Sequence, residues 1–160
     1  MMIKIVTPEN ISNHQGALEE SYRLRYNVCV KQWGWEIPNI SEHRDKDDFD
    51  TDHSIYFLAY NKHQLAGCIR LNPTTLPHMM TQIFSSYCNL GDIPLGQDIF
   101  ELSRYVIDVN LLTRRELLTL MAQLEYRVTE YCLNNGISKV TWLTTKDIYT
   151  KNTALWKTTP

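Results

Sequence analysis

The chain has 160 residues, enough for one domain with a sizeable hydrophobic core. Its composition, with 43% hydrophobic and 21% charged residues, is typical of a soluble globular protein. The formal net charge of -2 gives no general attraction to nucleic acid or anionic membranes, and no apolar run approaches the roughly 20 residues that span a bilayer. We therefore expect a cytoplasmic domain with no nucleic-acid partner and no membrane span.

The first half of the chain predicts a strand, a helix and a hairpin. Apolar residues recur at helical spacing after residue 16, until Trp33-Gly34-Trp35 and Pro38 interrupt the pattern. A polar, acidic stretch follows and is typical of a loop. Two apolar and aromatic runs around a polar turn then indicate a buried hairpin. The expected elements are a strand at 3–6, a helix at 16–30, a loop at 41–53 and strands at 55–60 and 65–71.

The second half predicts a short helix, a strand, a long helix and a last strand. Thr113 and Glu116 have the spacing of a capping box, in which each side chain accepts a hydrogen bond from the other residue's backbone N–H. Apolar residues follow at helical spacing until Gly136. The expected elements are a helix at 79–87, a loop at 91–97, a strand at 99–109, a helix from Thr113 to Gly136 and a strand at 137–145.

This order of elements favours an α/β or α+β sandwich with a mixed sheet. The long capped helix lies between two strands and therefore acts as the crossover of a parallel pair. No Gly-rich turn joins the first strand to the first helix, which argues against a dinucleotide-binding unit.

The cysteines and histidines predict no metal site. The four cysteines are scattered without CxxC spacing, and no two of the five histidines are four positions apart on a predicted helix. We interpret the cysteines as small buried thiols in a reducing compartment. A His–Cys catalytic pair remains an alternative that nothing in the spacing supports.

The acidic stretch Asp45–Asp52 has five aspartates in eight positions. One interpretation is a solvated acidic loop. Phe49 inside the stretch, and Trp33 and Trp35 before it, are costly to expose, and carboxylates combined with aromatic rings suit a cationic ligand. The residues alone leave both interpretations open.

Glu101 and Arg104 place two charges in an otherwise apolar strand, where unpaired buried charges are expensive. A structural ion pair between them is one interpretation. In a regular strand they face opposite sides, and a bulge would re-aim one of them, as bulges beside active sites do. Arg25 and Arg70 also lie in apolar sequence. They are either snorkelling surface residues or members of a charge network around one cleft.

Taken in order, these stretches resemble the acyl-homoserine-lactone synthase, or autoinducer synthase, family. The resemblance runs from about Ser21 to Pro160 and rests on the ordered set with its spacings. The matching stretches are Tyr22-Arg23-Leu24-Arg25-Tyr26-Asn27-Val28, Gly34-Trp35, Asp45-x-Asp47-x-Phe49-Asp50, Gly67-Cys68-Ile69-Arg70-Leu71-x-Pro73-Thr74-Thr75, Pro77, Phe84 and Phe100-Glu101-Leu102-Ser103-Arg104.

The resemblance implies an N-acyltransferase-like fold with a mixed, strongly twisted sheet flanked by helices. It implies a bacterial quorum-sensing enzyme that transfers an acyl group from acyl-carrier protein to the amine of S-adenosylmethionine. Lactonisation then releases methylthioadenosine, and S-adenosylmethionine is a substrate, so no cofactor is implied. The strands at 100–107 and 139–145 would splay apart and admit the phosphopantetheine arm of the donor.

The resemblance also implies site residues, whose roles are hypotheses. Glu101 would be the base, directly or through water, with Asp47 and Arg104 as further catalytic residues. Asp47 and Asp50 would hold the ammonium or order their loop, and Arg25 and Arg104 would bind a carboxylate or stabilise the acidic cluster. The substrate-binding residues would be Arg25, Trp35, Asp45, Asp50, Arg70 and Phe84, with Ser103, Thr144 and Thr145 facing the acyl chain.

An acidic carrier protein would need a basic docking face. Its candidate residues are Arg114, Arg115, Lys139, Lys146 and Lys151, and an ordinary solvated surface is the alternative. The family normally continues for a few tens of residues beyond the position of Pro160. We therefore expect residues 1–160 to form a single acyltransferase-like domain that lacks its C-terminal part.

Two other functions stay open. One is a related N-acyltransferase that acylates another amine, such as an amino acid. The other is a non-catalytic relative that binds ligand without turnover. A plain acetyl-coenzyme A acetyltransferase is less favoured, because residues 108–115 contain no Gly-rich pyrophosphate loop.

Overall fold

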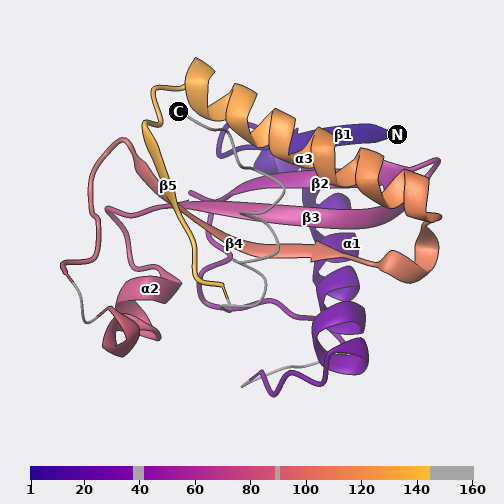
Figure 1. Cartoon of the computed structure of the whole chain (residues 1–160), viewed down its shortest axis with the longest axis horizontal. Coiled ribbons are helices and arrows are strands. Elements are labelled where there is room, and N and C mark those ends of the chain that lie inside the picture. The colour runs from indigo at the N-terminus through magenta and orange to yellow at the C-terminus, as the bar shows by residue number, and fades with distance from the viewer. Residues whose placement is uncertain (38–41, 89–90, 145–160) are drawn as a thin grey trace.

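A mixed five-stranded sheet forms the centre of the computed structural model, which describes residues 1–37, 42–88 and 91–144. The strand order is β1-β2-β3-β4-β5, with antiparallel neighbours from β1 to β4 and a parallel β4–β5 pair (Figure 1). The parallel pair confirms the predicted crossover. The strands are β1 (Met2–Val6), β2 (Ile55–Asn61), β3 (Gln64–Pro73), β4 (Ile99–Ile107) and β5 (Lys139–Thr141).

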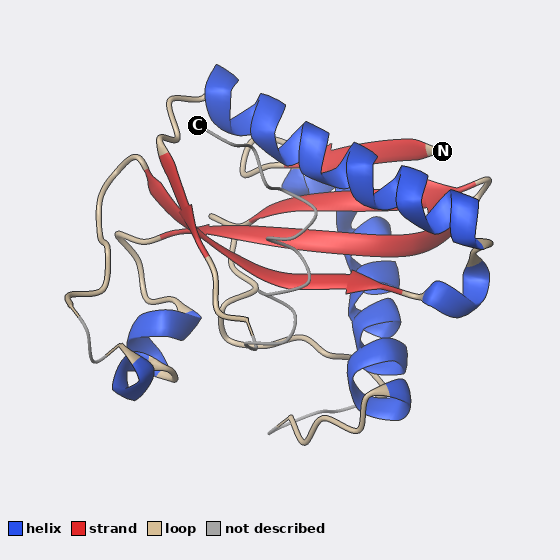
Figure 2. Ribbon diagram, in the orientation of Figure 1, coloured by secondary structure: helices blue, strands red, loops and turns tan. Residues whose placement is uncertain are grey.

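Helices cover both faces of the sheet, with α1 on one side and α3 on the other (Figure 2). In the described part of the chain, no helix is long and apolar enough to cross a membrane. The helical elements are η1 (Ile11–His14), α1 (Gln15–Arg25), η2 (Tyr26–Gln32), α2 (Met79–Gln82), η3 (Ser85–Tyr87), η4 (Val109–Leu111) and α3 (Arg114–Asn134).

The central strands are buried on both faces, and their alternating side chains build two cores. In β2, Tyr56 and Leu58 face α1 and η2, whereas Ile55 and Phe57 face α3. Every residue of β2 except Asn61 is buried. A strand between two layers of helices must be apolar on both sides, which is why this run reads as continuously hydrophobic.

Helix α3 begins and ends where the sequence predicts. The Thr113 N–H donates to Glu116 Oε2 at 2.8 Å, and the Glu116 N–H donates to Thr113 Oγ1 at 3.3 Å, which confirms the capping box. Leu120 and Leu124 are fully buried against the sheet. Gly136 follows the helix at φ 70°, a left-handed conformation that glycine adopts without strain.

The first predicted helix changes its period at Arg25. Residues Gln15–Arg25 form α1, and Tyr26–Gln32 continue as the π-helix η2. The wider turn is completed by the Trp33 N–H, which donates to the Val28 carbonyl at 2.9 Å across five residues. A π-helical turn inside a helix is rare and frequently marks a functional site.

Several other boundaries differ from the predictions, and β3 extends to Pro73, two residues beyond the predicted end. The helix predicted at 79–87 is two short turns, α2 and η3, and β4 ends at Ile107, two residues early. The last strand covers only Lys139–Thr141 of the predicted 137–145. Residues 142–144 are irregular, and Thr145 lies outside the described residues.

Candidate functional site

Three arginines and three aspartates meet on the face of the sheet that α1 covers. We call this group the Arg–Asp cluster. Its arginines come from α1, β3 and β4, and its aspartates come from the loop between η2 and β2. The members are Arg25, Arg70, Arg104, Asp45, Asp47 and Asp50.

Arg25, the last residue of α1, clamps the loop with a bidentate ion pair. Its Nη1 and Nη2 donate to Asp50 Oδ1 and Oδ2 at 2.8 and 2.7 Å, and its Nε donates to Asp45 Oδ2 at 3.3 Å. The planar guanidinium matches the carboxylate fork, so two parallel hydrogen bonds fix the geometry of Asp50. Arg25 therefore ties two points of the loop to the end of the helix.

Arg70, in the middle of β3, binds the loop from the side of the sheet. Its Nη1 lies 2.6 Å from Asp47 Oδ1 and 2.8 Å from Asp50 Oδ1. Its Nε donates to Ser103 Oγ at 3.0 Å across the β3–β4 pair. Arg70, its register partner Tyr56 on β2 and Ser103 on β4 thus form one row on the α1 face.

Arg104 completes the cluster from a β-bulge. The register between β3 and β4 shifts between Cys68 and Arg70, and Arg104 has φ 52°. This conformation turns its side chain to the face that also carries Ser103, and Nη2 lies 2.8 Å from Asp47 Oδ2 and donates to Asp45 Oδ1 at 3.0 Å. The bulge expected near Glu101 and Arg104 is therefore confirmed.

The cluster is buried and mutually neutralised. The side chains of Arg25 and Arg70 are 1% exposed, and those of Asp45 and Asp50 are 0% exposed. Burial by itself would raise the pKa of Asp50, but Arg70 and Arg25 outweigh burial and hold that pKa well below its usual range. Asp50 also accepts a hydrogen bond from the Tyr56 hydroxyl at 3.0 Å.

These positions decide between the interpretations left open by the sequence. Arg25 and Arg70 are not snorkelling surface residues, because they are almost fully buried. The solvated-loop interpretation is wrong for Asp45, whereas Asp48 and Asp52 are exposed. The aspartates of this stretch therefore have different surroundings, and the three with arginine partners are the ones that point inward.

Glu101 does not pair with Arg104, so the simple ion-pair interpretation of these two residues is wrong. Glu101 is 3% exposed, and its Oε2 and Oε1 accept the backbone N–H groups of Met79 and Met80 at 3.0 and 2.6 Å. These are the first two residues of α2. Backbone N–H groups at a helix start lack partners within the helix, so a carboxylate there is well placed.

The remaining predicted site residues lie outside this core. Trp35 is 47% exposed and its ring lies 5.3 Å from that of Trp33. Phe84 follows α2 and packs edge-on against Tyr87 at 6.1 Å. Thr144 is half-buried beyond β5, and Thr145 lies outside the described residues. Six of the predicted charged residues thus meet in one cluster, whereas the aromatic and acyl-side residues flank it.

Sequence reasoning missed several contributors to the site. Tyr56 looked like an ordinary residue of a buried strand, although a hydroxyl buried there needs a hydrogen-bond partner. The Met79 and Met80 amides are backbone groups with no signature in the sequence. The aromatic neighbour of Trp35, Trp33, was visible as half of the Trp-Gly-Trp triplet.

Three of the four cysteines, Cys29, Cys68 and Cys132, are buried as predicted, whereas Cys88 is partly exposed. Cys29 and Cys68 are buried, and burial raises the pKa of each thiol to about 12. Such thiols are poor nucleophiles at neutral pH. In the described ranges, no group of three His, Cys, Asp or Glu side chains is placed to hold a metal.

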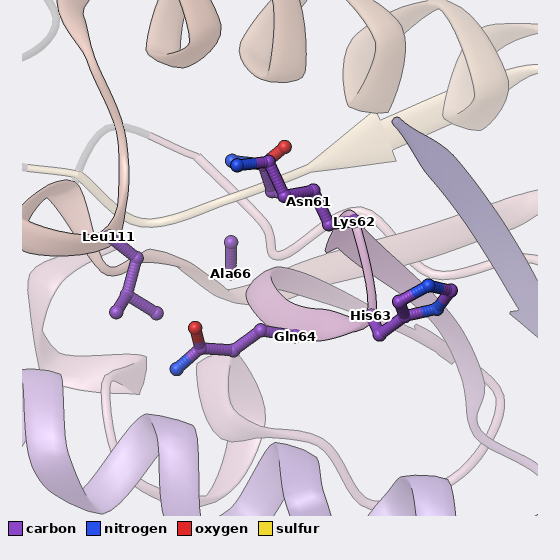
Figure 3. Close-up of a pocket in the computed structure, with 6 residues that line it drawn as sticks. All are labelled: Asn61, Lys62, His63, Gln64, Ala66 and Leu111. Atoms are coloured by element: carbon purple, nitrogen blue, oxygen red, sulfur yellow. The ribbon is translucent and has the colours of Figure 1, made fainter.

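A hollow of about 380 Å³ lies at the turn between β2 and β3, at the opposite end of these strands from the Arg–Asp cluster (Figure 3). Its lining contains amides, one lysine, one histidine and two aliphatic side chains, but no carboxylate. The hollow is therefore separate from the residues predicted to act in catalysis and substrate binding. The lining residues are Asn61, Lys62, His63, Gln64, Ala66 and Leu111.

The expected basic docking face is divided by the fold. Arg114 and Arg115 begin α3, whereas Lys139 begins β5 after that helix has ended. A helix of 21 residues is about 30 Å long. The two arginines and the lysine therefore lie at opposite ends of α3, and Lys146 and Lys151 are outside the described residues.

The comparison with known proteins places this geometry in a family. The autoinducer synthase family matches residues 9–150. An isovaleryl-homoserine lactone synthase of Bradyrhizobium diazoefficiens is 32% identical over 139 residues, which are 87% of this chain and 62% of that protein. The chain thus spans less than two thirds of the length of that relative.

The comparison with solved structures points to the same family. The structures of BjaI, a CoA-dependent acyl-homoserine lactone synthase, with MTA and with SAM and isopentyl-CoA are 29% identical, with a TM-score of 0.85 over 96% of this chain and 71% of that chain. An aminoglycoside acetyltransferase from soil metagenomic DNA shares the fold at 12% identity and a TM-score of 0.52, over 99% of this chain and 87% of that chain. The chain belongs to the autoinducer synthase family.

Proposed function

We propose that this protein makes an acyl-homoserine lactone from S-adenosylmethionine and an acyl thioester. The substrate amine attacks the thioester carbonyl, the carbon–sulfur bond breaks, and a thiol leaves. The methionyl carboxylate then attacks its own γ-carbon, and the sulfonium leaves as methylthioadenosine. The observation that carries the proposal is the Arg–Asp cluster beside Glu101, because it joins, in one place, the charged residues of the family resemblance.

Glu101 is the group proposed to take the ammonium proton, directly or through a water molecule. It lies on the same sheet face as Ser103, two residues along β4. Each of its oxygens already accepts one amide and keeps a second lone pair. The Met79 and Met80 amides hold the carboxylate still, so proton transfer needs no search for the productive geometry.

Within the cluster, the proposed role of Arg25, Arg70, Asp45 and Asp50 is to order the loop that borders the substrate site. Their charges are paired with one another and leave little for a ligand. Asp47 is the most exposed of the three acids, with 16% of its side chain accessible. It is therefore the aspartate proposed to meet the substrate.

Arg104 is the proposed contact for the methionyl carboxylate. Its hydrogen bonds to described residues use Nη2 alone. Nε lies 3.0 Å from Asp45 Oδ2 without hydrogen-bond geometry. A guanidinium edge therefore remains for a carboxylate, which it matches in shape and charge.

For Trp35 and Phe84 we propose contact with the adenosyl and sulfonium part, since aromatic faces favour cations.

The acyl donor is proposed to enter where β4 and β5 part. Among the described residues, pairing between them covers Ile99 to Glu101, while β4 continues to Ile107. The β4 backbone beyond Glu101 is the part proposed to bind the amide groups of a phosphopantetheine arm. Ser103 and Thr144, and Thr145 outside the described residues, are proposed to face the acyl chain.

Acyl-carrier protein remains the proposed donor, with acyl-coenzyme A as the alternative raised by the CoA-dependent relative. At the start of α3, Glu116 occupies the Thr113 N–H and hydroxyl. A carboxylate there competes with the pyrophosphate of coenzyme A for the same donors and repels it. Arg114 and Arg115, both exposed, are the part of the predicted basic face proposed to meet the carrier.

Product analysis tests the proposal. The chain is incubated with S-adenosylmethionine and a panel of acyl-carrier proteins and acyl-coenzyme A thioesters, and acyl-homoserine lactone and methylthioadenosine are measured by mass spectrometry. Both products are expected in equal amounts. An acylated amino acid, when amino acids are added, would indicate the related N-acyltransferase. S-adenosylmethionine binding by calorimetry without methylthioadenosine release would indicate a non-catalytic relative.

Replacing the proposed base sharpens this test. Glu101→Gln keeps an oxygen for one of the α2 amides but cannot take a proton, so turnover is expected to fall about 100-fold or more at saturating substrates. Circular dichroism checks that the variant is folded. Full turnover in Glu101→Gln would show that another group is the base.

A further inference from the structure

Two buried polar side chains, one on β3 and one just before α2, each keep an atom without a hydrogen-bond partner among the described residues. These atoms are Asn72 Oδ1 and His78 Nε2. Asn72 is 3% exposed and His78 is 1% exposed. Buried polar atoms are rarely left unpaired, because losing their water costs about 1–3 kcal/mol each. Both atoms therefore call for a partner that the described residues do not supply.

Asn72 is the register partner of Glu101 across the β3–β4 pair, so the two side chains share a face of the sheet. Its Nδ2 donates to the Phe49 carbonyl at 3.0 Å. This bond fixes the orientation of the amide, since a reversed amide would place two acceptors against each other. Oδ1 is thereby turned away from the Phe49 loop and remains an acceptor.

His78 lies next in the chain to the residues that bind the same carboxylate. It precedes Met79 and Met80, whose N–H groups bind Glu101. His78 Nδ1 lies 2.8 Å from the Leu76 carbonyl, which can only accept, so Nδ1 carries the hydrogen. With the hydrogen on Nδ1 alone, Nε2 keeps a lone pair and can accept a hydrogen bond, like Asn72 Oδ1.

We propose that Asn72 and His78, together with Glu101, form an acceptor site that binds the protonated amine of the acceptor substrate. This inference rests on the proposed function. An ammonium group offers three N–H donors and a positive charge, and the site offers two neutral acceptors and one carboxylate. Nearby carboxylates in the Arg–Asp cluster are already paired with arginines, so they compete poorly for the same ammonium.

Variants of His78 distinguish the role of its Nδ1 bond to the Leu76 carbonyl from the role of its unpaired Nε2. In His78→Asn the side-chain amide can replace Nδ1 in the bond to the Leu76 carbonyl, but nothing reaches the position of Nε2. In His78→Gln the amide oxygen reaches that position. Asn72→Leu removes Oδ1 while keeping the volume, and it also removes the Nδ2 bond to the Phe49 carbonyl, so the methylthioadenosine measurement is its control for the fold. His63→Asn is the matched control, because His63 is exposed at the far end of the sheet.

Three ligands distinguish the contribution of the amine to binding from the contribution of the rest of the substrate. Calorimetry measures Kd for S-adenosylmethionine, for its decarboxylated form, which keeps the amine, and for methylthioadenosine, which has neither amine nor carboxylate. For His78→Asn and Asn72→Leu we expect about tenfold weaker binding of the two amines and unchanged binding of methylthioadenosine. His78→Gln is expected to recover part of the loss, and His63→Asn to change nothing.

Other results overturn the inference. Equal weakening of methylthioadenosine would mean that the two residues only support the fold. Unchanged binding of both amines, with lower thermal stability, would mean that the acceptors hold a structural water. If the unaltered protein binds none of the three ligands, the proposed function fails, and this outcome differs from a failure of the acceptor site alone.

Discussion

The Arg–Asp cluster and the acceptor site lie on one face of the sheet but are built in opposite ways. In the cluster, every charge has an opposite partner within the protein, and the central ion pairs are closed to water. In the acceptor site, Asn72 and His78 keep unpaired polar atoms. The cluster is largely neutralised within the protein and leaves Asp47 and one edge of Arg104 for a ligand, whereas the acceptor site keeps two unpaired neutral acceptors.

This difference indicates that the cluster orders the loop, whereas the acceptor site binds the substrate. Residues 42–54 have almost no regular secondary structure, and the three aspartates fix this loop to α1, β3 and β4. Ordering a loop costs about 1–2 kcal/mol per residue in backbone entropy, and the ion pairs offset part of that cost in advance.

Removing Arg70 should have the largest effect on this arrangement. Arg70→Ala leaves Asp47 and Asp50 with one fewer buried cation each, and breaking buried pairs in this way costs about 3–5 kcal/mol. Urea denaturation followed by circular dichroism measures the free energy of unfolding. Arg115→Ala, an exposed change, should cost less than about 0.5 kcal/mol. Equal small losses in both variants would contradict a stabilising role for the cluster.

A smaller, pH-dependent effect should come from Asp50. Its pKa is depressed in the folded protein, so its ionised form contributes stability above the usual aspartate value of about 4, and this contribution is lost as pH falls toward the folded pKa. The thermal midpoint should therefore drop below about pH 4. Asp50→Asn should be less stable at pH 7 and should approach the unaltered protein in acid. Parallel curves at all pH values would contradict this account.

Much of the fold follows from local rules that the sequence obeys. The hairpin of β2 and β3 is marked by two apolar runs around a polar turn, and α3 carries its cap and its glycine stop. The parallel β4–β5 pair follows from the crossover helix between them. Single charges in apolar strands, Arg70 and Glu101, pointed to the site because such residues must find partners.

The partners themselves could not be predicted from spacing. Arg104 and Asp45 are 59 positions apart, and they meet because a bulge turns one strand residue toward the loop. The π-helical period after Arg25 is set by packing, since the sequence there is compatible with an ordinary helix. Glu101 binds backbone amides, which leave no trace in the side-chain sequence.

Hydrogen–deuterium exchange with and without S-adenosylmethionine tests the separate roles of the cluster and the acceptor site most directly. The account predicts that amides of residues 44–54 are protected in the free protein and change little on binding. Amides of residues 72–80 and 99–104 should gain protection when S-adenosylmethionine is added. A loop at 44–54 that exchanges freely until the ligand binds, with no change near Glu101, would contradict the claim that the ion pairs order this loop before the substrate binds at Glu101.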